Sequence, residues 1–269
     1  MRIKQRDRFT FREAVPDGAQ TGPPVILAHG FPESSLMWVP LMEALAAAGR
    51  RSIAPDLYGL GDSTDREPAT FERNLEQLGA LHRGLDLGRV AIVVHDWGGF
   101  IGLAWACENP GSVEALVISD TGFFHDGRWH GLAEGIRSEQ GEALVAALDR
   151  EGFAGLLRGD GGEFTDAEVN AYWRPFEDGH GQRATLDFYR SMDFAKLAPY
   201  DGDLAALGVP TLLIWGAEDK FAPLGGAKRF EREIPGARLV AIEGAGHFVF
   251  DQEPERCIDE VVSFLAERA

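Results

Sequence analysis

Short apolar runs that alternate with helix-like stretches constrain the fold of this chain more than any other feature. The runs contain few polar positions, which is typical of strands buried on both faces of a parallel sheet. They occupy residues 24–30, 51–56, 90–96, 114–120, 210–216 and 237–244, and the helical stretches occupy residues 34–48, 71–86, 98–109, 224–233 and 254–267. This alternation predicts an α/β fold with a mostly parallel, doubly wound sheet, in which ligands bind at the carboxyl ends of the strands.

The alternation stops between residues 121 and 204, where the sequence has helical periodicity, many aromatic residues and no convincing strand. We therefore predict a core made of residues 1–120 and 205–269, with residues 121–204 inserted as a helical cap. The stretch "GDGGEF" (159–164) predicts a flexible loop within that cap. Near the start, "FTFREAV" (9–15) alternates polar and apolar residues, which predicts an antiparallel edge strand or a hairpin.

Charge and cysteine content exclude several classes of partner. The chain has 269 residues, with 26 Lys and Arg against 43 Asp and Glu, a formal charge of −17 that disfavours nucleic-acid and membrane partners. Cys107 and Cys257 are too few for a disulfide framework and lack the spacing of a metal site. No stretch reads as a signal peptide or membrane span. We expect a cytoplasmic protein without metal or cofactor, either a monomer or a weak homodimer.

The stretch "VVHDWGGF" (93–100) places Asp96 at the corner between a buried strand and a helix. A carboxylate there can displace a leaving group from saturated carbon and form an alkyl ester on the enzyme. Gly98 and Gly99 allow the close backbone approach that a tight corner requires. The alternative is structural, because aspartate is also a favoured N-cap residue of helices.

Two further stretches supply what hydrolysis of such an ester needs: a base, an acid and amide donors. His247 lies in "GAGHFVF" (244–250) and Asp219 in "LLIWGAEDKFAP" (212–223), each after a predicted strand. The order Asp96, Asp219, His247 matches nucleophile, acid and base of a hydrolase triad. In "AHGFPES" (28–34), the Phe31 amide is expected to form an oxyanion hole with the amide of Trp97.

Together these motifs resemble those of capped α/β-hydrolases with an aspartate nucleophile, the group that contains haloalkane dehalogenases and epoxide hydrolases. The likeness extends over nearly the whole chain from about Phe9. The resemblance implies an eight-stranded core beneath a helical cap. It also implies that Asp120, which ends its predicted strand, is an alternative triad acid, as in one branch of dehalogenases. Otherwise Asp120 would cap the first helix of the cap.

The leaving group separates the two subfamilies. In a dehalogenase, Trp97 would donate its indole N–H to the departing halide, and Trp129, His130 or Tyr189 would be the second donor. In an epoxide hydrolase, Tyr189 in "LDFYRSMD" (186–193) would protonate the opening ring. We expect Asp96, Trp97, Phe31, Tyr189 and His247 to line one mostly apolar cavity.

The sequence thus predicts a hydrolase that acts through an Asp96 alkyl ester, with a small apolar molecule and water as substrates. Haloalkane dehalogenase activity is the preferred interpretation, and epoxide hydrolysis is the alternative. An esterase-like relative, or a non-catalytic binding or signalling protein on the same fold, is a lesser alternative.

Overall fold

An eight-stranded sheet forms the centre of the computed structural model, which describes residues 2–6, 9–63 and 65–267. The strand order is β1-β2-β4-β3-β5-β6-β7-β8. The strands are β1 (Arg2–Arg6), β2 (Phe9–Ala14), β3 (Val25–Ala28), β4 (Ser52–Pro55), β5 (Val90–His95), β6 (Val113–Ser119), β7 (Thr211–Gly216) and β8 (Arg238–Ile242). β2 pairs antiparallel with β1 and β4, and all other pairs are parallel. The predicted mostly parallel sheet and the terminal hairpin are confirmed.

The central strands are mostly apolar because both of their faces are covered. Every residue of β3 and β5 is buried. The buried apolar side chains form two hydrophobic clusters. Neighbouring residues of one strand belong to different clusters: Ile92 lies in the first cluster and Val93 in the second. β8 lies at the sheet edge and is partly exposed.

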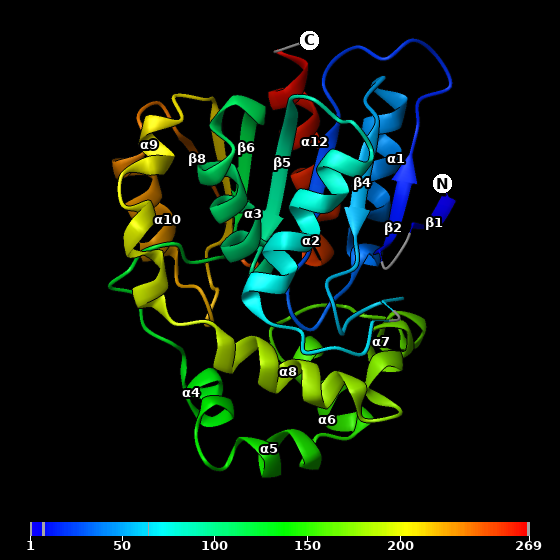
Figure 1. Ribbon diagram of the computed structural model, residues 1–269, viewed down its shortest axis with the longest axis vertical. Coiled ribbons are helices and arrows are strands. Elements are labelled where there is room, and N and C mark those ends of the chain that lie inside the picture. Colours follow the sequence, from blue (N-terminus) through cyan, green and yellow to red (C-terminus); the bar gives the residue numbers. More distant parts are fainter. Residues whose placement is uncertain (1, 7–8, 64, 268–269) are drawn as a thin grey trace.

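Helices on the two faces of the sheet form these clusters (Figure 1). α2 (Phe71–Gly84), α3 (Trp97–Glu108) and α10 (Leu224–Glu233) contribute to the first cluster, whereas α1 (Val39–Ala47) and α12 (Pro254–Ala266) contribute to the second. The sheet is therefore doubly wound, as the sequence predicts.

Between β6 and β7 the described chain contains helices and no strand. The main helices of this segment are α4 (Gly131–Arg137), α5 (Gly141–Ala147), α6 (Arg150–Arg158), α7 (Asp166–Trp173) and α8 (His180–Ser191), followed by the short α9 (Asp203–Ala206). In Figure 1, α4–α8 gather beyond the carboxyl ends of the parallel strands. This arrangement is what a cap requires, but the division at residues 121 and 204 stays a prediction.

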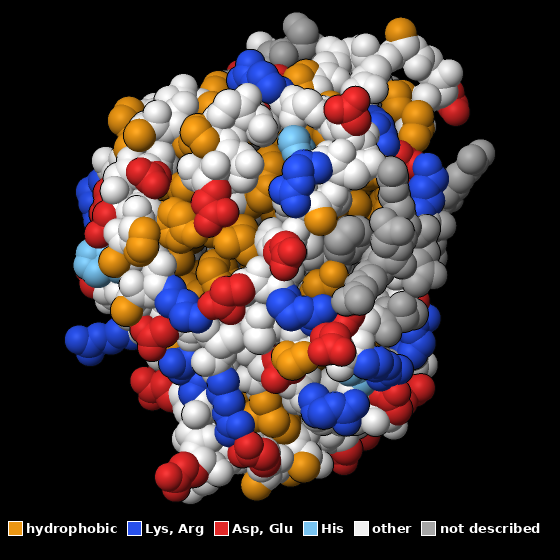
Figure 2. Space-filling model, in the orientation of Figure 1, with side chains coloured by type: hydrophobic (Ala, Val, Ile, Leu, Met, Phe, Trp, Pro, Cys, Tyr) orange, Lys and Arg blue, Asp and Glu red, His pale blue; other side chains and the backbone are white. Residues whose placement is uncertain are grey.

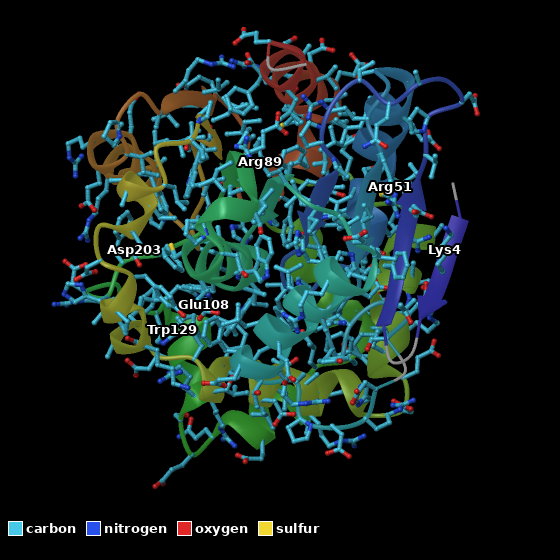
Figure 3. The ribbon with its side chains drawn as sticks, turned by 45° about the horizontal axis from the view of Figure 1, so that its top comes forward. Lys4, Arg51, Arg89, Glu108, Trp129 and Asp203 are labelled. Atoms are coloured by element: carbon cyan, nitrogen blue, oxygen red, sulfur yellow. The ribbon has the colours of Figure 1, made fainter. Side chains whose placement is uncertain are left out.

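The outer surface carries charges of both signs. At the sheet edge, Lys4 and Arg51 both pair with the buried Glu13 and tie β1 to the sheet (Figure 3). On the face in Figure 2, basic side chains stand among acidic ones. Among the described residues, no helix is both long enough and apolar enough to cross a bilayer.

Candidate active site

Asp96 occupies a strained corner where β5 meets α3. Its backbone angles are φ 47° and ψ −116°, a left-handed φ that non-glycine residues rarely adopt. The corner needs glycine on its inner side, because a Cβ on Gly98 would lie 2.1 Å from the carbonyl oxygen of Ala28. The Asp96 side chain makes no capping hydrogen bond with α3. The N-cap interpretation of Asp96 is therefore wrong, because the carboxylate points away from the helix amides.

The Asp96 carboxylate lies between an amide donor and an imidazole. Oδ1 accepts a 2.8 Å hydrogen bond from the Phe31 N–H, and Oδ2 lies 3.5 Å from Nε2 of His247. Burial by itself raises the pKa of Asp96, but His247 and the Phe31 amide outweigh burial and lower it. The carboxylate is thus ionised and held in one orientation.

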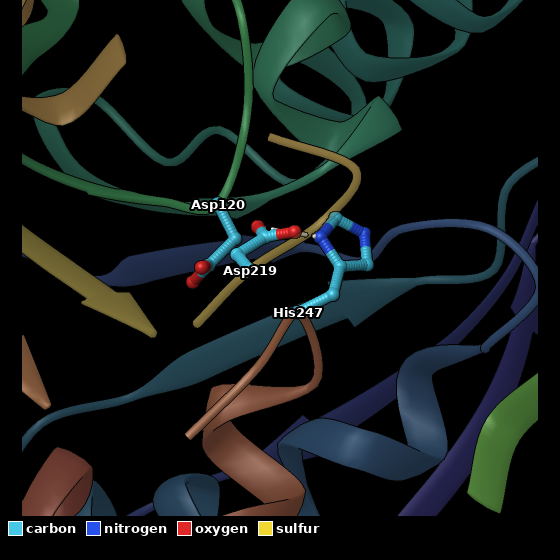
Figure 4. Close-up of side chains that lie close together, drawn as sticks. All are labelled: Asp120, Asp219 and His247. Carbon is cyan, nitrogen blue, oxygen red and sulfur yellow. Dashed lines mark hydrogen bonds and ion pairs between the residues drawn. The ribbon is translucent and has the colours of Figure 1, made fainter. Parts of the chain in front are cut away.

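His247 follows β8 and is anchored by Asp219, which follows β7. Nδ1 of His247 lies 2.9 Å from Oδ2 of Asp219 (Figure 4). The other Asp219 oxygen accepts the N–H groups of Phe221 and Ala222. Burial opposes the charge on Asp219, yet the positive His247 and these hydrogen bonds lower its pKa to about 2. In turn, burial would lower the pKa of His247, but the charges of Asp219 and Asp96 raise it well above its usual value.

Asp120, the alternative acid, lies at the end of β6 beside Asp219 rather than on the histidine ring. Its Oδ1 accepts the Gly216 N–H at 3.0 Å, and its Oδ2 accepts the Ser119 hydroxyl at 2.5 Å. Its interpretation as the cap of the first cap helix is wrong, since the His130 side chain caps α4 instead. Burial, and then the nearby Asp219 charge, raise the pKa of Asp120.

Asp120, Asp219 and His247 also form a group whose potential ligand atoms lie within 4.8 Å of one another. His247 Nδ1 and both Asp219 oxygens are already engaged by each other and by backbone N–H groups. A metal ion would have to break these bonds, so we assign none to the group.

Two cavities meet at Asp96, and the predicted single cavity is therefore wrong in part. The larger one, about 210 Å³, contains Asp96, Trp97 and Tyr189 in its lining. The smaller one, about 20 Å³, contains Asp96 and Tyr189 together with Phe31 and His247. The two linings share Asp96, His130, Tyr189 and Phe221.

Aromatic side chains dominate the larger cavity. Besides Trp97 and Tyr189, its lining includes Phe100, Phe124, Trp129, Phe194 and Phe221. Trp129, marked in Figure 3, is stacked on Trp97 at 5.8 Å between ring centroids. A cavity of about 150 Å³ can hold benzene, so this one suits a slightly larger apolar molecule.

Besides the Asp96 carboxylate, the polar side chains in the lining include several hydrogen-bond donors; the polar residues are Thr121, Arg128, His130, Trp97, Trp129 and Tyr189. A hydrogen bond joins the Trp97 indole to the Tyr189 hydroxyl, although burial and then the Asp96 charge raise the pKa of Tyr189. Nε1 of Trp129 is buried and has no hydrogen-bond partner within the described residues. His130 uses Nδ1 to cap α4, and burial lowers its pKa.

The structure also shows contacts that the sequence did not predict. Asp160, in the loop predicted to be flexible, accepts a hydrogen bond from the His247 backbone N–H, and Gln252 donates to its carbonyl oxygen. Behind the histidine, the fully buried Glu33 lies 3.3 Å from Nε2 of His95, and burial raises the pKa of Glu33 to about 7. Glu33 is part of the "AHGFPES" motif, whereas no local signal could have pointed to Asp160.

Asp219, His247 and Asp96 thus follow β7, β8 and β5 at the carboxyl edge of the sheet, which is where the triad of an α/β-hydrolase is expected. The chain belongs to the alpha/beta hydrolase fold family, which it matches over residues 23–254. It is related to haloalkane dehalogenases. One such enzyme, from Sphingobium indicum strain B90A, is 31% identical over 271 residues, covering 91% of this chain and 89% of the relative.

Other similar proteins include one enzyme with a different activity and several solved structures. A cis-3-alkyl-4-alkyloxetan-2-one decarboxylase from Xanthomonas campestris pv. campestris is 26% identical, with 93% of this chain and 90% of the relative covered. Among solved structures, a putative ancestral haloalkane dehalogenase has a TM-score of 0.83 at 23% identity, covering 99% of both chains. An alpha/beta hydrolase fold protein from Burkholderia ambifaria has a TM-score of 0.82 at 22% identity and 98% coverage of both chains. These structural matches support the fold alone.

Proposed function

We propose that this protein hydrolyses carbon–halogen bonds of small apolar molecules through an alkyl ester on Asp96. The observation that carries the proposal is the Asp96 carboxylate, oriented by the Phe31 amide at the end of a mostly aromatic cavity. The relationship to haloalkane dehalogenases, at 31% and 32% identity, supports the same reaction.

In the first step, an Asp96 oxygen attacks the carbon that carries the halogen, and the bond electrons leave with the halide. The donors near the halide are the Tyr189 hydroxyl, the Trp129 N–H and the Trp97 N–H, which would exchange its bond to Tyr189 for one to the halide. Trp129 is well suited to this role because its buried N–H has no partner among the described residues. The aromatic walls exclude water from this step.

In the second step, His247 takes a proton from water, and the resulting hydroxide adds to the ester carbonyl carbon of Asp96. The Phe31 and Trp97 amides hold the oxyanion; the Trp97 amide is at the start of α3, where helix N–H groups have no partner within the helix. The alcohol then leaves with the proton from His247, and Asp96 releases its own proton. Asp219 stabilises the imidazolium.

Epoxide hydrolysis is the second candidate, favoured by the Tyr189 hydroxyl beside Asp96. Here Tyr189 would protonate the oxygen of the opening ring, and the ester would be hydrolysed as above. The Xanthomonas relative adds a strained four-membered lactone as a third class of substrate to test.

The two half-reactions can be separated in the variant His247→Gln, which lacks the base for ester hydrolysis. We expect it to lose turnover but to release one leaving group per enzyme molecule and to keep the alkyl group on the peptide containing Asp96. Loss of a general base commonly slows a step by about 10²–10⁴-fold, so intact-protein mass spectrometry should detect the ester.

Substrates would be 1-bromobutane, styrene oxide and a dialkyl oxetan-2-one. An adduct with the mass of the alkyl group indicates dehalogenation, and one with the mass of the whole epoxide indicates ring opening. The control is His125→Gln, an exposed histidine that pairs with Asp201 and should leave turnover unchanged. Absence of any adduct with a substrate that the wild type consumes would refute the covalent mechanism.

A further inference from the structure

Two buried carboxyl groups, not one, lie beside His247. Asp120 and Asp219 end the neighbouring strand regions β6 and β7, and their potential ligand atoms and those of His247 lie within 4.8 Å of one another. In Figure 4, Asp219 faces the His247 ring and Asp120 stands on the other side of Asp219. A triad needs only one acid, so the second carboxyl group requires an explanation.

The surroundings of the two groups favour a negative charge on Asp219 only. Asp219 contacts the His247 ring and accepts two backbone N–H groups. Asp120 is fully buried, and its hydrogen bonds come from the neutral Gly216 amide and Ser119 hydroxyl. Two carboxylates this close do not both ionise readily, so the weaker site keeps the proton.

We propose that Asp120 and Asp219 form a carboxyl pair that holds one proton, with Asp219 as the ionised partner of His247 and Asp120 as a neutral positioning residue. When the Asp219 charge is removed, Asp120 ionises and takes over as the acid partner of the histidine. The role of His247 in ester hydrolysis rests on the proposed function, whereas the sharing of the proton does not.

The opposite pKa directions of the two groups agree with this geometry: burial and then the Asp219 charge raise the pKa of Asp120, while that of Asp219 is lowered to about 2. Asp120 also lies near Cys257, which is buried and neutral. The other titratable groups that interact with the Asp219–His247 pair are Asp96, Asp160, Glu33, His95 and His130.

The kinetic test compares decay of the Asp96 ester in Asp120→Asn, Asp219→Asn and the double variant, by quenched-flow mass spectrometry across pH. Asparagine keeps the shape of aspartate and tolerates the left-handed φ of residue 120. We expect Asp120→Asn to stay within about threefold of the wild type, because an amide can still donate to Asp219. The exposed Asp259→Asn on α12 is the control and should match the wild type.

The Asp219→Asn variant should lose its ester at least about tenfold faster than the double variant, and its decay rate should rise with pH as Asp120 ionises. Equal decay of these two variants at every pH would overturn the proposal. An Asp120→Asn variant that is as slow as Asp219→Asn would also overturn it, because Asp120 would then be required in the wild type.

A titration of the His247 ring by nitrogen-15 NMR tests the same pair without substrate. The pKa of His247 should be lower in Asp219→Asn than in the wild type, and lower again in the double variant, because the last partner charge on the Nδ1 side is removed. Equal pKa values in Asp219→Asn and the double variant would contradict the shared proton. If no substrate alkylates Asp96, the proposed function fails, and this titration still decides the proposal.

Discussion

The charge on Asp96 should control when His247 can act as a base. Nε2 of His247 lies 3.5 Å from the Asp96 carboxylate, and at an effective dielectric constant of about 20 this attraction is about 5 kcal/mol. Since 18% of the Asp96 side-chain surface is exposed, water screens part of this attraction, and the remainder raises the pKa of His247. In the free enzyme His247 is therefore an imidazolium, which cannot accept a proton.

Alkylation turns Asp96 into a neutral ester and so lowers the pKa of His247 toward neutrality. The variant Asp96→Asn reproduces this loss of charge, because asparagine tolerates the left-handed φ and still accepts the Phe31 N–H. We expect the pKa of His247 to fall clearly in Asp96→Asn but to stay elevated by Asp219. Ester hydrolysis, which needs neutral His247, should then slow as the pH falls below this reduced pKa.

The assay is a pH titration of the histidine ring by nitrogen-15 NMR, with His247 assigned by its absence in His247→Gln. The exposed Asp17→Asn serves as the control and should leave the His247 pKa unchanged. A change of less than about 0.5 in Asp96→Asn would refute the reasoning, because a contact at 3.5 Å cannot be that weak in a site this buried.

Two further substitutions test the cavity and the cap. Trp129→Phe keeps an aromatic ring but removes the N–H, so halide displacement should slow by about 10- to 100-fold, the rate change expected from losing a hydrogen bond to a charged group. The control is Trp173→Phe, because the Trp173 ring stacks on Phe176 outside the cavity. Equal displacement rates in the two variants would exclude Trp129 as a halide donor. Asp160→Ala removes the acceptor of the His247 backbone N–H. In urea unfolding, this variant should lose about 1 kcal/mol of its free energy of unfolding. In single-turnover kinetics, its ester hydrolysis should slow more than its halide displacement. Asp160→Asn retains an acceptor oxygen and should behave as the wild type, so an Asn variant as impaired as the Ala variant would contradict this role.

The strands and the chain order of the candidate triad could be predicted because they depend on local pattern. The run Val90–His95 is buried on both faces, so it is apolar up to its last residue, and Gly98 must be glycine because of the tight corner. Since parallel strands end at one edge of the sheet, the residues after β5, β7 and β8 had to converge. These predictions needed no knowledge of side-chain contacts.

The sequence favoured Asp219 over Asp120, because the Asp219 loop neighbours the His247 strand and its flanking residues match those of the resembling family, but Asp120 also follows a predicted strand and stayed an alternative. The choice is made by side-chain direction and by the two backbone N–H groups aimed at Asp219, which exist only after the loop folds. The same holds for the two cavities that share Asp96 and Tyr189 in their linings and for the indole of Trp129, which has no partner among the described residues. Asp160 reaches His247 across 87 residues of sequence, and no local periodicity encodes such a contact. Local pattern determines elements and their order, whereas hydrogen-bond partners and charges depend on groups that only tertiary packing brings together.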